Sequence, residues 1–89
     1  MRTLEIIQMR SAGSDLGELA NQISETIRNL NEGNQVAKLF LRSGLETDIA
    51  VHIHRDSNTS SGGKSEIGLR LAAALRNHGI VEHTIWKEA

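Results

Sequence analysis

The sequence predicts an α+β fold in one domain, with a four-stranded antiparallel sheet that carries two helices on one face. Three observations predict this fold. Apolar and polar residues alternate in four segments, as in strands, and apolar residues recur at helical spacing in two others. These segments follow one another in the order strand, helix, strand, strand, helix, strand. That order is the ferredoxin-like βαββαβ pattern, or split βαβ.

The expected elements account for nearly the whole chain, which forms a single domain over residues 1–89. Strands are expected at 3–10, 36–42, 48–54 and 80–87, and helices at 15–30 and 65–78. The stretch 55–64 is rich in serine and glycine, and we expect a flexible loop there.

Each expected helix has one apolar stripe. In the first helix the stripe comprises Leu16, Leu19, Ala20, Ile23, Ile27 and Leu30, with Ser14 or Asp15 as the N-cap candidate. In the second helix it comprises Ile67, Leu71, Ala74, Leu75 and His78. Ser65 is the expected N-cap of the second helix, and Gly79 is expected to end it in a Schellman motif.

The strands differ in how cleanly they alternate. In the third strand Ile49, Val51 and Ile53 form one aliphatic face, which is expected to pack against the helices. The first and last strands offer apolar residues to both faces, whereas a sheet with one solvated face should alternate cleanly. We therefore expect the face away from the helices to be covered, and in an isolated domain only another chain can cover it.

The composition excludes several classes of protein. There are no cysteines, so the fold has no disulfide or thiolate metal site, and the core must come from aliphatic residues because only 2% of residues are aromatic. The net charge of −1, with no basic block, argues against nucleic-acid binding. No apolar run is long enough to span a membrane. A cytoplasmic protein is the expectation, and its small core favours a homodimer.

Two histidines are the main candidates for chemistry. His52 and His54 lie two residues apart in one strand, so both rings project from the same face of the sheet. Such a pair can bind a metal, transfer protons or orient a ligand. A metal would need further donors, for which Glu5, Glu82 and Asp56 are the candidates. We expect polar contacts in a pocket or an interface, with no metal and no cofactor.

Phe40 and Trp86 are the two aromatic residues, and both fall in expected strands. If they share a face with His52 and His54, they form the wall of an amphipathic pocket. His83 in the last strand is a further candidate, but the sequence leaves open which face it occupies. The alternative interpretation is that each aromatic residue only packs in the fold.

The segment Ser-Gly-Gly-Lys-Ser at 61–65 follows a strand and opens a helix, as a phosphate-binding P-loop does. The P-loop motif needs an earlier glycine, and Asn58 stands at that position. Anion binding at the helix N-terminus, assisted by Lys64, is a second interpretation. A flexible loop with a serine cap is the simplest one, and we favour it.

In element order and in its length of 89 residues, the chain resembles the dimeric α+β-barrel superfamily, whose best-known branch is the antibiotic-biosynthesis monooxygenases. The early Leu-Glu-Ile-Ile-Gln strand at 4–8 and the two-sided first and last strands carry the resemblance. It implies a homodimer in which two sheets face each other, with small-molecule sites in the barrel or between sheet and helices. It implies no catalytic residue.

The sequence therefore favours a homodimer that binds a small molecule at the sheet face, at a site lined by Phe40, His52, His54, His83 and Trp86. A cofactor-independent enzyme, monooxygenase- or isomerase-like, is an alternative in which His52 or His54 acts as acid or base. A structural interaction module without a ligand is another. The sequence does not decide whether the chain is an enzyme.

Overall fold

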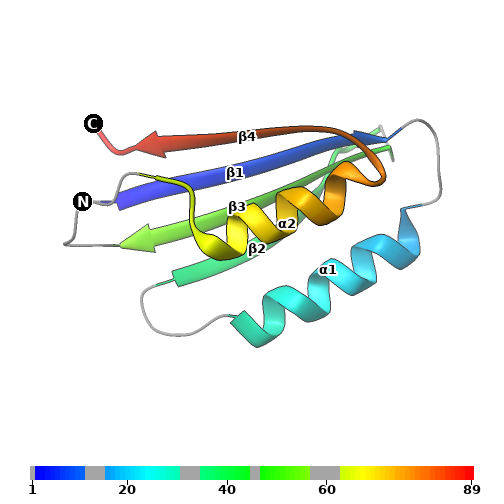
Figure 1. Cartoon of the computed structure of the whole chain (residues 1–89), viewed down its shortest axis with the longest axis horizontal. Coiled ribbons are helices and arrows are strands. Elements are labelled where there is room, and N and C mark those ends of the chain that lie inside the picture. The colour runs from blue at the N-terminus through cyan, green and yellow to red at the C-terminus, as the bar shows by residue number, and fades with distance from the viewer. Residues whose placement is uncertain (1, 12–15, 31–34, 45–46, 57–62) are drawn as a thin grey trace.

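The computed structural model describes residues 2–11, 16–30, 35–44, 47–56 and 63–89 (Figure 1). The elements follow the predicted order. They are β1 (Arg2–Ser11), α1 (Gly17–Leu30), β2 (Gln35–Leu41), β3 (Asp48–Asp56), α2 (Glu66–Arg76) and β4 (Gly79–Lys87). The candidate cap of the first helix, at 14–15, and most of the expected loop lie outside the described residues. In the described part of the chain, no helix is both long enough and apolar enough to span a membrane.

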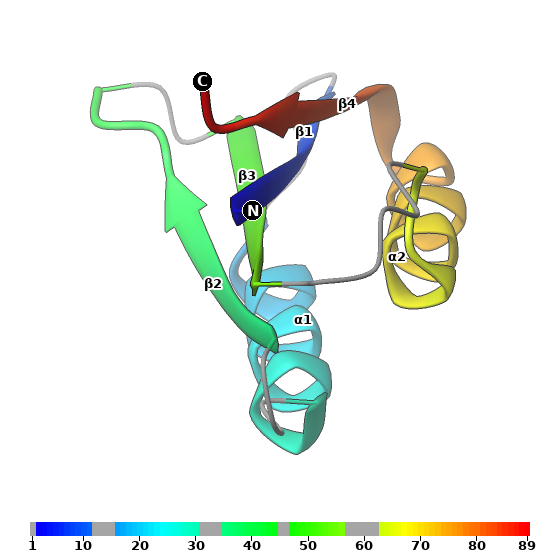
Figure 2. The same ribbon diagram turned by 90° about the vertical axis from the view of Figure 1, so that its left-hand side faces the viewer.

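The four strands form one sheet in the order β2-β3-β1-β4, and every neighbouring pair is antiparallel. Both helices lie against the same face of this sheet (Figures 1 and 2). The fold is therefore α+β and ferredoxin-like, as the sequence predicted.

The core lies between the sheet and the two helices. The predicted aliphatic face of β3 is confirmed, since Ile49, Val51 and Ile53 are almost completely buried. The stripe of the first helix is also confirmed, since Leu16, just before α1, and Leu19, Ile23 and Ile27 within it are buried. The other buried apolar side chains are Ile7, Met9, Ala37, Leu71, Ala72 and Leu75.

The buried face of α2 differs from the predicted stripe. Leu71 and Leu75 are buried as expected, but Ala74 and His78 are exposed. Gly68 and Ala72 are buried in their place. Small residues at 68 and 72 let this side of the helix approach the sheet closely, as the contact distances at Gly68 show.

The end of α2 also departs from expectation. Ser65 is the N-cap, as predicted, and its Oγ accepts a hydrogen bond from Gly68 N at 2.9 Å. Gly79, however, is not in the left-handed conformation and already belongs to β4, so the predicted Schellman ending is wrong. Glycine is needed at position 79 because β4 passes close to the backbone of β1 there, and a Cβ would lie 2.2 Å from the Arg10 carbonyl oxygen.

Candidate functional site

The face of the sheet away from the helices, here called the open face, carries the candidate site. The strand register places even-numbered side chains of all four strands on it, in rows across the sheet. Three successive rows are Val36–His54–Leu4–Trp86, Lys38–His52–Ile6–Thr84 and Phe40–Ala50–Gln8–Glu82. None of these side chains is fully buried, because no described helix covers this face (Figure 2).

The structure brings three of the predicted site residues into one cluster. The Phe40 and His52 rings are 4.6 Å apart between centroids, at an angle of 52°. The His52 and His54 rings are 6.5 Å apart, so the two imidazoles are neighbours on the open face, as the sequence predicted.

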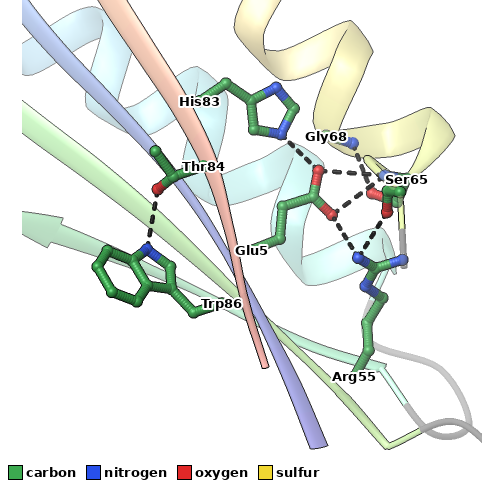
Figure 3. A network of polar contacts seen from close by, with 8 residues as sticks. Glu5, Arg55, Ser65, Gly68, His83, Thr84 and Trp86 are labelled. Carbon is green, nitrogen blue, oxygen red and sulfur yellow. Dashed lines mark hydrogen bonds and ion pairs between the residues drawn. The ribbon is translucent and has the colours of Figure 1, made fainter. Parts of the chain in front are cut away.

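Trp86 shares the open face with the histidines, next to Leu4, which separates it from His54. Its Nε1–H donates to Thr84 Oγ1 at 3.0 Å, and this bond orients the indole (Figure 3). His83 does not join the group. It pairs with Ile7 and faces the helices on the other side of the sheet.

Two hollows lie at opposite ends of the open face. The first, the Phe40 hollow, has a volume of about 500 Å³. It is lined by Gln8, Met9, Arg10, Phe40, Leu41, Arg42, Asp48, Ile49, Ala50, Ile80 and Glu82. The second, the Trp86 hollow, has a volume of about 450 Å³. It is lined by Arg2, Thr3, Leu4, Val36, His54, Arg55, Trp86, Lys87 and Glu88. Both volumes fall in the range of small-molecule sites, about 300–1,000 Å³.

The electrostatics of the open face favour a neutral His52. Partial burial lowers the pKa of His52 below its ordinary value of 6.5, and the neighbouring His54 lowers this pKa further. A neutral imidazole can both accept and donate a hydrogen bond, so His52 can orient a polar group or accept a proton near neutral pH.

At the end of the Phe40 hollow, Asp48 lies between two arginines, 3.0 Å from Arg42 and 3.7 Å from Arg10. Desolvation raises the pKa of Asp48. Hydrogen bonds from Arg42 and Thr47, and the charges of both arginines, outweigh that effect and hold the pKa below its usual value. Glu82 also lines this hollow, so two carboxylates balance the two arginines.

A buried polar network, which was not expected from the sequence, lies on the helix-facing side of the sheet and is centred on Glu5 (Figure 3). Glu5 is completely buried, and each of its carboxylate oxygens accepts from the Ser65 amide at 3.2 Å. His83 Nε2 lies 2.5 Å from one oxygen, and an Arg55 nitrogen lies 3.6 Å from the other. The sequence did contain an indication of this network, because Glu5 alternates in step with Ile7 and Met9 and so lies on the same, buried side of β1.

This network also bears on the anion-binding interpretation. The Glu5 carboxylate occupies the N-terminus of α2, where an external phosphate would bind to free amides. The Gly68 amide is bonded to Ser65 Oγ, and Arg55 donates to the Gly63 carbonyl at 2.9 Å. An internal anion thus satisfies this helix end, which favours the interpretation of a serine-capped helix start.

Among the described residues, no group of three or more His, Cys, Asp or Glu side chains is placed to hold a metal ion. Comparisons of the chain with protein-family models, with curated proteins and with solved structures give no significant match.

Proposed function

We propose that the chain is a homodimeric small-molecule-binding protein whose protomers meet through their open faces, with the ligand held between the two sheets. The observation that carries this proposal is the exposure of large apolar side chains on that face. Ile80 is 80% exposed, Trp86 59% and Phe40 45% in the single chain. Large apolar side chains exposed on one face of a sheet are typical of an interaction site.

The size of the open face suits a second copy of the chain. Four strands about 4.8 Å apart, with about eight residues each at about 3.3 Å per residue, give a face of about 500 Å². Two such faces packed together bury about 1,000 Å², which is the lower bound for a specific interface.

The charges on the open face are also self-complementary. Lys38 lies on β2 and Glu82 on β4, the two outer strands of the sheet. A two-fold axis parallel to the strands places β2 of one protomer over β4 of its partner. Lys38 and Glu82 then differ by one row, about 7 Å along the strands, which a lysine side chain can span. The dimer would contain two such ion pairs.

This arrangement is that of the dimeric α+β-barrel superfamily, in which two ferredoxin-like subunits face their sheets toward each other. The exposed apolar face supports a place in that superfamily. The two hollows supply the space for a ligand, and His52, His54, Phe40 and Trp86 supply its polar and aromatic contacts.

An enzyme acting without a cofactor on a small apolar substrate is the second candidate at the same site. The observation that favours it is the lowered pKa of His52, because a neutral imidazole beside an apolar wall can act as a general base.

The mass of the protein in solution, measured by light scattering during size-exclusion chromatography, tests the proposal. We expect twice the chain mass of 9.8 kDa for the unmodified protein at micromolar concentration. Phe40→Glu should give the monomer, because it places a carboxylate in the interface near Glu82 of the other protomer. Leu69→Glu is the matched control, since Leu69 is 50% exposed on α2, away from the open face.

A monomer at all concentrations would overturn the proposal. A dimer that Leu69→Glu disrupts and Phe40→Glu does not would also overturn it, since the helices and not the sheets would then form the interface.

A further inference from the structure

We propose that the Phe40 hollow binds a zwitterionic α-amino acid with an apolar side chain. The ligand carboxylate lies at Arg10, its ammonium group at Glu82 and its side chain against Phe40. This inference rests on the proposed small-molecule function of the open face, and it names both the subsite and the chemical class of the ligand.

The charged side chains of this hollow all lie on the open face. Antiparallel pairing aligns two successive rows over the four strands, which are Arg42–Asp48–Arg10–Ile80 and Phe40–Ala50–Gln8–Glu82. All eight positions are even-numbered, which is the parity that faces away from the helices. The odd-numbered residues of the lining are apolar and add no charge; they are Met9, Leu41 and Ile49.

The two signs of charge are separated across the sheet. Asp48 lies between Arg42 and Arg10, so these three residues carry one net positive charge over β2, β3 and β1. Glu82 on β4 carries the opposite charge and makes no ion pair within the described part of the chain. Arg10 and Glu82 are diagonal neighbours on adjacent strands, about 7–8 Å apart. The hollow therefore presents a cation and an anion that are close together but not paired with each other.

Arg10 keeps hydrogen-bond donors for a ligand. Its Nε lies 3.7 Å from Asp48 Oδ2, whereas Arg42 Nη1 donates to the same oxygen at 3.0 Å. The Arg10 side chain is also 70% exposed. A guanidinium group has five N–H donors, so Arg10 can bind a carboxylate in the bidentate geometry that arginine favours.

This arrangement of charges selects a zwitterion. An amino acid carries its carboxylate and its ammonium group on one carbon atom, so it can place one against Arg10 and the other against Glu82. An acid without an amine would meet the Glu82 carboxylate, and an amine without an acid would meet the Arg10 guanidinium. A carboxylate has about four acceptor positions, so Glu82 can take the ligand ammonium group together with Lys38 of the other protomer.

The apolar surface of the hollow accounts for the side chain of the ligand. Phe40 is only partly buried, and Ile80 is largely exposed. Ala50 is the cross-strand neighbour of Phe40, and its small side chain leaves space beside the phenyl ring. An alkyl or aryl group fits this space, and an aryl group gains a ring contact with Phe40.

Three probes with one apolar body test the ligand class by isothermal titration calorimetry. L-Phenylalanine carries both head groups, 2-phenylethylamine lacks the carboxylate and 3-phenylpropionate lacks the ammonium group. We expect L-phenylalanine to bind at least tenfold more tightly than either of the other two.

Variants locate the two head groups. Arg10→Gln should weaken L-phenylalanine binding about tenfold without weakening 2-phenylethylamine binding. Glu82→Gln should weaken L-phenylalanine binding about tenfold without weakening 3-phenylpropionate binding. Arg28→Gln and Glu25→Gln are the matched controls, since both residues are exposed on α1, and each should bind all three probes as the unmodified protein does.

The outcomes separate this inference from the proposed function. If the three probes bind equally, the preference for a zwitterion is overturned while a small-molecule site on the open face stands. If the control variants weaken L-phenylalanine binding as much as Arg10→Gln and Glu82→Gln, the Phe40 subsite is overturned. If no probe binds, the inference fails, and the solution mass decides separately whether the open faces form a dimer.

Discussion

At the scale of single residues, His52 is the side chain whose surroundings most constrain its chemistry. It is half-buried, with the Phe40 ring on one side and His54 on the other, and Lys38 is its cross-strand neighbour on β2. Burial, the adjacent His54 imidazole and the adjacent Lys38 ammonium group all disfavour a positive charge on the His52 ring. His52 is therefore suited to hydrogen bonding and proton acceptance and poorly suited to binding an anion.

The lowered pKa of His52 predicts how stability responds to acid. The unfolded chain binds the His52 proton at its ordinary pKa of 6.5, and the folded chain binds it only at lower pH. Stability should therefore fall as the pH drops below about 6.5, because the unfolded state then binds more protons. Histidine ring signals followed by NMR across this range would measure the pKa of His52 directly.

His54→Gln is the informative companion variant, since it removes the charge of the neighbouring imidazole and should move the His52 pKa toward 6.5. His52→Gln should flatten the loss of stability in acid. A His52 pKa at or above 6.5 in the unmodified protein would contradict the prediction.

At the scale of elements, the position of α2 depends on a carboxylate buried beneath its first turn. Glu5 on β1 accepts from the Ser65 amide, while Arg55 on β3 and His83 on β4 contact the same carboxylate. Three strands and one helix thus meet at one group. The favourable interaction of a carboxylate with a helix N-terminus helps to offset the cost of burying it. Gly68 provides the space in which the carboxylate lies.

Gly68→Ala should therefore destabilise the protein, although alanine ordinarily favours a helix over glycine by about 1 kcal/mol. A Cβ at position 68 would lie 1.8 Å from Glu5 Oε2, so the carboxylate or the helix must move. We expect a loss of about 2 kcal/mol or more in the free energy of unfolding, measured in urea at fixed protein concentration.

Gly63→Ala is the matched control, because a Cβ at Gly63 meets nothing within 4 Å. Its unfolding midpoint should stay close to that of the unmodified protein. A Gly68→Ala variant as stable as the unmodified protein would show that Glu5 does not hold α2 in place.

At the scale of the whole molecule, the two faces of the sheet differ sharply. The helix-facing side buries its central aliphatic residues on β1 and β3, whereas the open face leaves Ile80, Trp86 and Phe40 exposed in the single chain. The proposed dimer accounts for both its apolar residues and its opposed charges.

The proposed two-fold axis predicts a pattern of charge-reversal effects. Lys38→Glu alone and Glu82→Lys alone should each weaken the dimer roughly tenfold, because like charges then meet across the interface. The double variant Lys38→Glu with Glu82→Lys should recover most of the affinity. Sedimentation equilibrium over a range of protein concentrations would measure the three dissociation constants.

Lys64→Glu serves as the control, since Lys64 is exposed just before α2, outside the open face. If the double variant weakens the dimer by the product of the two single effects, Lys38 and Glu82 do not meet across the interface. The two-fold axis would then run in another direction.

His83 shows why part of the site could not be predicted. The odd positions of β4 contain Val81 and Ile85, and the even positions contain Ile80 and Trp86. Both parities are equally apolar, so the strand alone cannot indicate which one faces the helices. The antiparallel register with β1 decides, since it aligns His83 with the buried Ile7.

The sequence by itself determined the order of elements, the buried aliphatic face of β3, the stripe of α1 and the serine cap of α2. It also placed His52 and His54 on one face. These features follow from periods of two and 3.6 residues and from local hydrogen bonds, which depend on near neighbours in the chain. Only the tertiary structure decided the face of His83, the rotation of α2 and the Glu5 network, because these depend on register and close packing between segments far apart in the chain.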